Sequence, residues 1–362
     1  MIPADRHESE PWLRLTLIPG LGNAALRKLL LEFGSPERVL AARRAELQRV
    51  VEAELATQIA AGGNAVAAQQ AGAWLADSAN AIVTLADADY PQLLLQTADP
   101  PPLLYIKGRR ELLNRPALAV VGSRNATPQG IANAEAFARA LSDAGITIVS
   151  GLALGIDAAA HRGGLAGDAS SLAVVGTGLD VVYPARNRAL AHQLAVDGAL
   201  VSEFALGTPA LGANFPRRNR VISGISRGCL VVEAALQSGS LITARLANEQ
   251  GREVFALPGS IHSPLAKGCH ALIKQGAKLV DSADDILEEL GLGFTMSATP
   301  EVPGLDPDAA RLLAQLGFEP ATLDVLCARS GLGADVVAAL LLKLELQGLI
   351  SALSGGQYQR VR

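Results

Sequence analysis

Residues 214–244 contain the side chains best suited to chemistry in this chain. The segment reads NFPRRNRVISGISRGCLVVEAALQSGSLITA, in which an aromatic residue, three arginines and an asparagine precede an apolar strand that ends in a Ser-Gly-Ser turn. Phe215 can stack on a base, while Arg217, Arg218 and Arg220 can pair with phosphates. The backbone N–H groups of residues 239–240 can face an anion where a helix begins. The pattern predicts an anion site with a stacking residue, and single-stranded nucleic acid offers both features.

Two further turns have residues that could contribute to such a site. Gly122-Ser123-Arg124 directly follows the apolar run LAVV, so its amides could point at a phosphate while the arginine supplies a permanent charge. In SGLALGID, residues 150–157, Gly151 lies where the backbone must approach a ligand closely. Asp157 is placed to cap the helix that contains His161, and we interpret both as structural residues.

Several other kinds of site are disfavoured. The sequence GTGLD lacks the third glycine of a dinucleotide-binding turn, and the chain contains no Walker lysine motif, no G-x-S-x-G elbow and no H-E-x-x-H helix. His262, Cys269 and His270 match no common metal-site spacing. We therefore expect no cofactor, no metal and no catalytic residue.

Composition limits where a nucleic-acid site can lie. The net charge of −4 and the pI of about 5.8 argue against a surface that coats DNA, and aromatic residues make up only 4% of the chain, so the site must be local. The chain has no apolar run of the ~18 residues that a membrane span needs and no signal pattern at its start. A soluble, cytoplasmic protein without membrane contact is expected. Its three cysteines are expected to be buried and reduced.

The central part of the chain alternates strand and helix patterns. Six short apolar runs end in turns, most of them rich in glycine or serine, and each is followed by a helical stretch. They are LAVVGSR, ITIVSGLALGID, SLAVVGTGLD, ALVSEF, CLVVEAALQSGS and EVFALPGS. This alternation predicts an α/β protein with a doubly wound, Rossmann-like parallel sheet. Ligands of such sheets lie beyond the carboxyl ends of the strands, where the strand order reverses, and the motifs described above fall there.

Different patterns flank this sheet, which is assigned to residues 79–290. Residues 1–78 predict a helical domain, SAM-like or helix-hairpin-helix-like. Its turn Pro19-Gly20-Leu21-Gly22 either holds a phosphate or simply joins two packed helices. Residues 291–305 have the composition of a linker, and residues 306–362 predict three short helices and a hairpin that resemble a winged helix. The last helix, near 334–347, has Lys343 as its only basic residue, which favours packing or partner contact over DNA reading.

Taken in order, the motifs of the chain resemble those of the DprA/Smf family of DNA-processing proteins. The motifs include GSRNATPQG, SGLALGIDAAAH, VVGTGLDVVYPARN, FPRRNRVISGIS and VVEAALQSGSLITARLANEQGREVFALPGSI, and the match runs from about Tyr90 to Val280. The resemblance implies a protein of competence and natural transformation that binds and protects single-stranded DNA (ssDNA) and loads the RecA recombinase for recombination. It also implies a homodimer formed through the central domain and no catalytic step.

The resemblance also implies which residues build the DNA pocket. They are Gly122, Ser123 and Arg124; Phe215, Arg217 or Arg218, Asn219 and Arg220; Gly239, Ser240 and Thr243; and Lys267 with Gly268. Because these are arginines and one aromatic residue rather than base-specific donors, we expect little sequence preference and a marked salt dependence. Gly164 stands where the family usually has alanine, which is expected to loosen that helix by ~1 kcal/mol.

Two other functions are left open. The central domain resembles, more distantly, nucleoside monophosphate phosphoribohydrolases, which use a PGGxGTxxE turn after a comparable strand. Residues 238–243 read SGSLIT, without a glutamate at the matching position, so Glu233 would have to be repurposed. The remaining alternative is an interaction scaffold whose pocket binds a nucleotide signal.

Overall fold

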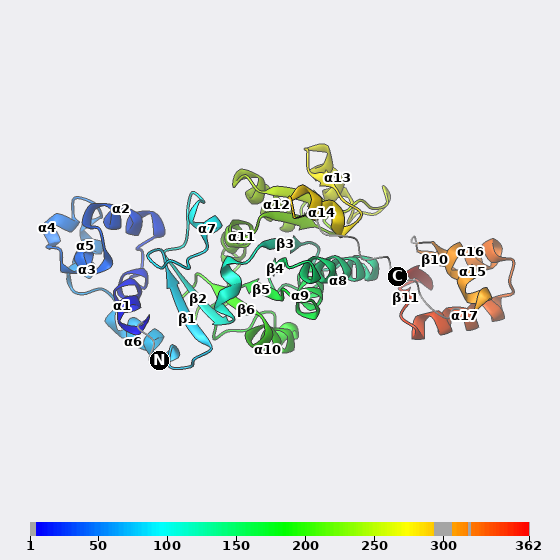
Figure 1. The fold of residues 1–362 in the computed structure, drawn as a ribbon, viewed down its shortest axis with the longest axis horizontal. Coiled ribbons are helices and arrows are strands. Elements are labelled where there is room, and N and C mark those ends of the chain that lie inside the picture. The colour runs from blue at the N-terminus through cyan, green and yellow to red at the C-terminus, as the bar shows by residue number, and fades with distance from the viewer. Residues whose placement is uncertain (1–4, 293–305, 318–319, 362) are drawn as a thin grey trace.

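The computed structural model describes residues 5–292, 306–317 and 320–361 (Figure 1). Three parts follow one another along the long axis: a group of helices, a central sheet with helices around it, and a small C-terminal unit. The first part comprises α1 (Asp5–Thr16), α2 (Asn23–Phe33), α3 (Pro36–Ala41), α4 (Arg44–Leu47), α5 (Ala53–Ala60) and α6 (Ala65–Trp74). The predicted linker, residues 291–305, lies almost entirely outside the described residues.

A nine-stranded sheet forms the centre of the described structure, in the order β1-β2-β6-β5-β4-β3-β7-β8-β9. The strands are β1 (Asn80–Thr84), β2 (Leu103–Gly108), β3 (Ala117–Val121), β4 (Thr147–Ser150), β5 (Ser171–Val174), β6 (Ala199–Ser202), β7 (Gly228–Val231), β8 (Glu253–Ala256) and β9 (Lys278–Leu279). Neighbours from β6 to β9 are parallel, while β2 is antiparallel to both β1 and β6. The predicted α/β class with a mostly parallel sheet is confirmed, and β1 and β2 extend it at one edge.

Helices cover both faces of this sheet, and β3 shows how its sequence requires them. Ala119 and Val121 belong to one buried cluster, whereas Leu118 and Val120 belong to the cluster on the opposite face. The first face packs against α7 (Gln92–Leu95), α11 (Asn214–Ile225), α12 (Ser240–Glu249) and α13 (Lys267–Lys274). The second packs against α8 (Pro128–Asp143), α9 (Ile156–Ala166) and α14 (Ala283–Glu289). The continuous apolar runs of the sequence are thus explained by burial on both sides.

Gly164 corrects one expectation from the sequence. A Cβ atom at this position would lie 2.9 Å from Cβ of Ile148 in β4 and 3.0 Å from Cβ of Ser171 in β5. The missing side chain therefore lets α9 lie close against the sheet. This close approach offsets the lower helix propensity of glycine.

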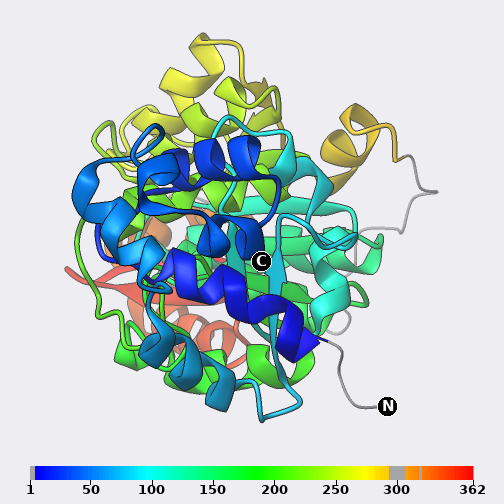
Figure 2. The same ribbon diagram turned by 90° about the vertical axis from the view of Figure 1, so that its left-hand side faces the viewer.

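The N-terminal helices pack directly on one edge of the sheet. Trp12 and Leu13 of α1 share a buried cluster with Ile82 of β1 and Tyr105 of β2. The ring of Trp74, at the end of α6, meets that of Tyr105 edge-on, with centroids 5.9 Å apart. Figure 2, viewed from the N-terminal side, shows these helices in front of the core. The helical patterns predicted for this part of the chain are confirmed.

The C-terminal unit has its own small core. It contains α15 (Pro307–Leu316), α16 (Leu323–Ser330), α17 (Ala334–Leu346) and a sheet in the order β10 (Ala321–Thr322), β12 (Gln357–Arg360), β11 (Ile350–Leu353). Three helices and a terminal hairpin form the predicted winged helix. Within the described ranges, no single helix is long and apolar enough to cross a membrane; α16 and α17 meet that test only as a pair bent by 109°.

Candidate functional site

The strand order reverses between β3 and β7, and a cavity of about 720 Å³ opens at the carboxyl ends of these strands. It is lined by the turns after β3 and β7 and by α11. Nine of the predicted site residues line it: Gly122, Ser123, Arg124, Phe215, Arg218, Asn219, Gly239, Ser240 and Thr243. Their ligand-binding roles stay predictions, but their convergence on one cavity is a feature of the fold.

The turn after β3 is fixed by backbone contacts. Ser123 donates its N–H to the carbonyl of Glu233, 2.7 Å away, and its carbonyl accepts the N–H of Ile156 at 3.1 Å. A Cβ on Gly122 would lie 2.6 Å from Cγ1 of Ile156, so only glycine fits there. The expectation that the Ser123 amide faces a phosphate is therefore wrong, because this N–H already donates to the carbonyl of Glu233, just after β7. Arg124, the next residue, is exposed.

Arg124 and Tyr183 both approach the ring of Phe215 beside the cavity. The guanidinium carbon of Arg124 lies 5.8 Å from the centre of the Phe215 ring, and the ring of Tyr183 lies 5.5 Å from Phe215 at 36°. Gly176 lets Phe215 approach the end of β5, since a Cβ there would lie 2.9 Å from the Phe215 ring. Tyr183 was not predicted from the sequence. It lies in the motif VVYPARN, far along the chain from the arginines of residues 217–220, next to which the stacking residue Phe215 was predicted.

Arg218 lines the cavity but is largely buried in its wall. Residues 214–225 form α11, and Arg218, Val221, Ile222 and Ile225, spaced by three and four, are all buried on its inner side. Arg218 Nη1 donates to the carbonyl of Gly151 at 2.7 Å and to that of Val174. Burial lowers the pKa of Arg218 to about 10. Through Nη1 this guanidinium ties the ends of β4 and β5 to α11, while its buried Nε has no hydrogen-bond partner, so its predicted phosphate contact stays a prediction.

The loop after β4 is built around the same arginine. Gly151 is buried against it, since a Cβ there would lie 2.6 Å from its guanidinium nitrogens. Asp157 accepts the N–H groups of Gly151 at 3.1 Å and Ala153 at 3.3 Å, rather than capping its own helix as predicted. Burial raises the pKa of Asp157, although the nearby Arg218 opposes that rise. Both Gly151 and Asp157 thus support the cavity wall.

His161 is structural, as predicted. Its Nε2 accepts the N–H of Leu152 at 3.3 Å, and its Nδ1 lies 2.7 Å from Oγ of Ser171. That hydroxyl donates to the carbonyl of Ile148, so Nδ1 is the protonated nitrogen. Burial lowers the pKa of His161 to about 3, so the ring is neutral at physiological pH.

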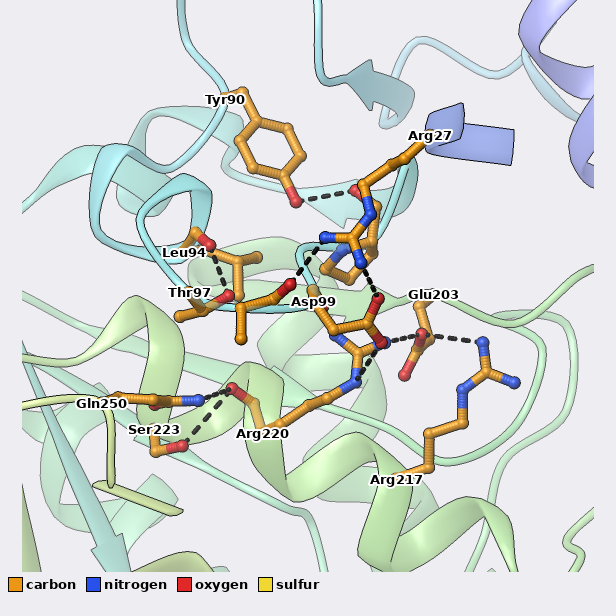
Figure 3. A network of polar contacts seen from close by, with 12 residues as sticks. Arg27, Tyr90, Leu94, Thr97, Asp99, Glu203, Arg217, Arg220, Ser223 and Gln250 are labelled. Carbon is orange, nitrogen blue, oxygen red and sulfur yellow. Dashed lines mark hydrogen bonds and ion pairs between the residues drawn. The ribbon is translucent and has the colours of Figure 1, made fainter. Parts of the chain in front are cut away.

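Arg220 and Arg217 point away from the cavity, into a charged network behind α11 (Figure 3). The Arg220 side chain is 14% exposed and pairs with Glu203 and with Asp99. Arg27 of α2 approaches Asp99 from the other side at 3.0 Å. Arg217 is 50% exposed and lies 3.2 Å from the same Oε2 of Glu203 that Arg220 contacts. The prediction that Arg220 contacts phosphate is contradicted by its burial in this network.

The start of α12 and the loop after β8 complete the cavity. Helix α12 begins at Ser240, as predicted, but the Ser240 amide donates to Oγ of Ser238 at 3.3 Å, and the Ser238 and Ser240 hydroxyls lie 2.7 Å apart. Leu265 lines the cavity, whereas Lys267 and Gly268 do not. The Gly268 amide donates to the carbonyl of Ala234 at 2.7 Å. The Ser240 amide is therefore already bonded, and the hydroxyls of Ser238 and Ser240 are polar groups of this turn that can face a ligand.

The acidic residues near the cavity do not form a catalytic pair. Both carboxylate oxygens of Glu233 are bonded to Thr127, one to its hydroxyl at 2.6 Å and one to its N–H at 2.9 Å. Glu233 therefore fixes the start of α8 and does not line the cavity. In the described part of the chain, no three or more His, Cys, Asp and Glu side chains are grouped to hold a metal. Cys229 and Cys269 are buried, but Cys327 is only partly buried, contrary to expectation.

Known proteins share both the sequence and the fold. The family described as DNA recombination-mediator protein A matches residues 81–291, and the DprA winged helix domain matches residues 296–356. Protein Smf of Escherichia coli strain K12 is 46% identical over 298 residues, covering 80% of this chain and 79% of that protein. DNA processing protein DprA of Streptococcus pneumoniae is 47% identical over 206 residues, covering 57% and 73%.

Two solved structures resemble this one. The X-ray structure of DprA from Streptococcus pneumoniae has a TM-score of 0.69 and 35% identity and covers 80% of this chain and 99% of its own. A DprA structure from Helicobacter pylori, described for its ssDNA-binding mode, has a TM-score of 0.53 and 29% identity and covers 58% of this chain and 95% of its own. Together with the motifs around the cavity, these matches show that the chain belongs to the DprA/Smf family of DNA-processing proteins.

Proposed function

We propose that this protein binds ssDNA in the cavity at the ends of β3 and β7. The observation that carries the proposal is the exposed Arg124 beside the ring of Phe215 at that cavity, with Tyr183 next to the same ring. Bases stack on aromatic rings regardless of sequence, and an exposed arginine beside them can pair with the backbone phosphate. The relative from Helicobacter pylori, whose structure is described for its ssDNA-binding mode, supports the same ligand class.

The electrostatics of the cavity favour a local rather than a spread contact. Among the described residues, Arg124 forms no ion pair, and its charge is exposed beside the ring of Phe215. Asp157 is the single acidic residue that lines the cavity; it is buried, and its amide contacts face the loop after β4. A strand bound here would lie against the exposed Arg124, the ring of Phe215 and the hydroxyls of Ser238 and Ser240. Binding should be salt-dependent and show little sequence preference.

The family relationship adds to the proposal what happens to the strand after it is bound. We propose a cytoplasmic protein without catalytic activity that protects incoming ssDNA and loads the RecA recombinase onto it during natural transformation. From the same family relationship we also propose a homodimer through the central domain. The bonding of Glu233 to Thr127 gives no support to the phosphoribohydrolase alternative.

The first experiment measures fluorescence anisotropy of a labelled single strand, with duplex DNA as competitor and a salt titration. We expect strand-selective, salt-sensitive binding that Arg124→Gln weakens while the melting temperature stays unchanged. Absence of binding by the unaltered protein at low salt would reject the proposed ligand. RecA filament assembly on coated single strands would then test the loading step.

A further inference from the structure

A second cavity lies on the other side of α11, and the ssDNA proposal does not use it. Its volume is about 360 Å³, and it is lined by the turn between α1 and α2, the start of β2 and the segment after β6. Arg217 lines this cavity, whereas Phe215 and Pro216 line the first. Residues two apart on a helix point roughly 200° apart, so the two cavities flank the first turn of α11.

The turn between α1 and α2 gives this cavity a site for an anion. Gly20, with φ of +85°, makes the tight turn, and Gly22 is the N-cap of the eleven-residue helix α2. No side chain caps this helix, and both Gly22 and Asn23 line the cavity. The first amides of a helix lack partners within it and carry partial positive charge. Arg217 adds a full positive charge to the same cavity.

Two buried polar groups in the same lining lack partners, which is the independent sign that something occupies the cavity. The Glu203 side chain is 2% exposed, and its Oε1 has no hydrogen-bond partner. Tyr105 is 2% exposed, and its hydroxyl also has none. Buried polar atoms are normally paired, and a carboxylate oxygen requires a donor. A phosphate alone does not supply that donor, but the amino group of a nucleobase does.

The charges of the network leave this cavity open to an anion despite the glutamate. Glu203 contacts both Arg217 and Arg220, and Asp99 contacts both Arg220 and Arg27 (Figure 3). Three arginines thus share two carboxylates, which leaves one positive charge in excess. Arg217 is the half-exposed member of the three and faces the cavity, so the excess charge is available there.

We infer that this second cavity binds a further nucleotide unit of the same single strand. Its phosphate lies at the amides of α2 and at Arg217, and its base directs a donor toward Glu203. The inference rests on the proposed function and extends the footprint of the strand around the first turn of α11. An α-helix with its side chains is about 10–12 Å across, more than one nucleotide step, so a dinucleotide in the first cavity does not reach the second.

The test compares a short strand, a dinucleotide, with a long one of about 16 nucleotides, on the full chain. Asn23→Asp adds a negative charge at the first position of α2 with almost no change of shape, and an acidic residue there favours the helix. We expect it to weaken the long strand about fivefold to tenfold and to reduce its salt slope by roughly 0.7, the value of one single-strand phosphate contact. The short strand should bind as before.

Matched variants separate the outcomes. Gln48→Glu, which adds the same charge at the exposed C-cap of α4 outside the cavity, should bind the long strand like the unaltered protein, and Arg217→Gln should reproduce the length-selective loss. An unchanged affinity for the long strand in Asn23→Asp, or an equal loss for both lengths, would overturn the second cavity while leaving the first intact. If the unaltered protein bound neither oligonucleotide, the proposed function itself would fail, and this inference with it.

Discussion

The two sides of helix α11 use the same residue types for opposite purposes. On the cavity side, half-buried Phe215 is approached by the side chains of Arg124 and Tyr183, and Arg218 is buried in the cavity wall against backbone carbonyls. On the opposite side, Arg220 is held by two carboxylates. A basic cluster in a sequence is therefore not a basic surface in the fold. The role of each arginine depends on which side of the helix it occupies and on which groups already pair with it.

The largest expected effect comes from the buried side. Arg218→Met should lower the free energy of unfolding by about 3–5 kcal/mol, because it leaves Asp157 buried without its opposite charge and frees the carbonyl of Gly151. Chemical denaturation followed by circular dichroism measures this. Arg217→Met is the matched control and should cost less than about 1 kcal/mol, because its ion pair is half exposed. Equal losses in both variants would erase the distinction between the two arginines.

His161 tests the same buried wall through pH. Its pKa is about 3 in the folded protein and 6.5 in the unfolded chain, so between these values the unfolded state binds the extra proton. Its contribution to stability is thus complete above pH 6.5 and is lost as the pH falls toward 3. Between pH 7 and pH 5 the loss should be ~2 kcal/mol. His161→Gln should flatten this part of the stability curve; an unchanged slope would mean that His161 is protonated in the fold.

The fold was predictable from the sequence to a greater extent than the side-chain roles. Apolar runs that end in glycine turns imply a parallel sheet, and its ligand edge then brings residues 122–124 and 239–243 together. The direction of each arginine required α11 as a helix, since Arg218 shares a three-and-four spacing with Val221 and Ile222. That signal was present in the sequence. The partners of Arg220 were not readable, because Asp99 and Glu203 come from distant segments.

The exposed side should respond to charge without loss of stability. Arg124→Glu should weaken ssDNA binding about tenfold to thirtyfold, because it replaces a phosphate partner by a repulsive charge beside the stacking ring. Anisotropy titrations give the affinity, and thermal melting should show no change beyond about 0.5 kcal/mol. Arg162→Glu, on α9 and outside the cavity, is the control for net charge. A similar loss in both variants would indicate general repulsion rather than a site.

Phe215 sharpens the comparison by separating stacking from charge. Phe215→Ala should weaken binding by about 1–2 kcal/mol, the value of one stacked base, with little change in the slope of affinity against salt. Phe215→Tyr keeps a ring next to Arg124 and Tyr183 and should bind nearly as well. The salt titration distinguishes the two contributions. A reduced salt slope in Phe215→Ala would show that the ring mainly positions Arg124.

The smallest effect is expected at Lys267, which the family resemblance assigns to the DNA pocket but which does not line the cavity. Lys267 is exposed at the start of α13 and does not line the cavity, whereas Gly268 is fixed by its bond to Ala234. A Cβ on Gly268 would lie 2.5 Å from the Ala234 carbonyl oxygen, so the glycine is explained by packing alone. Lys267→Gln should therefore change ssDNA affinity less than about twofold, no more than Lys274→Gln at the other end of the helix. A loss as large as that of Arg124→Gln would instead extend the binding surface past the loop after β8 to α13. Helix α13 would then belong to the binding site rather than to the structural region around the cavity.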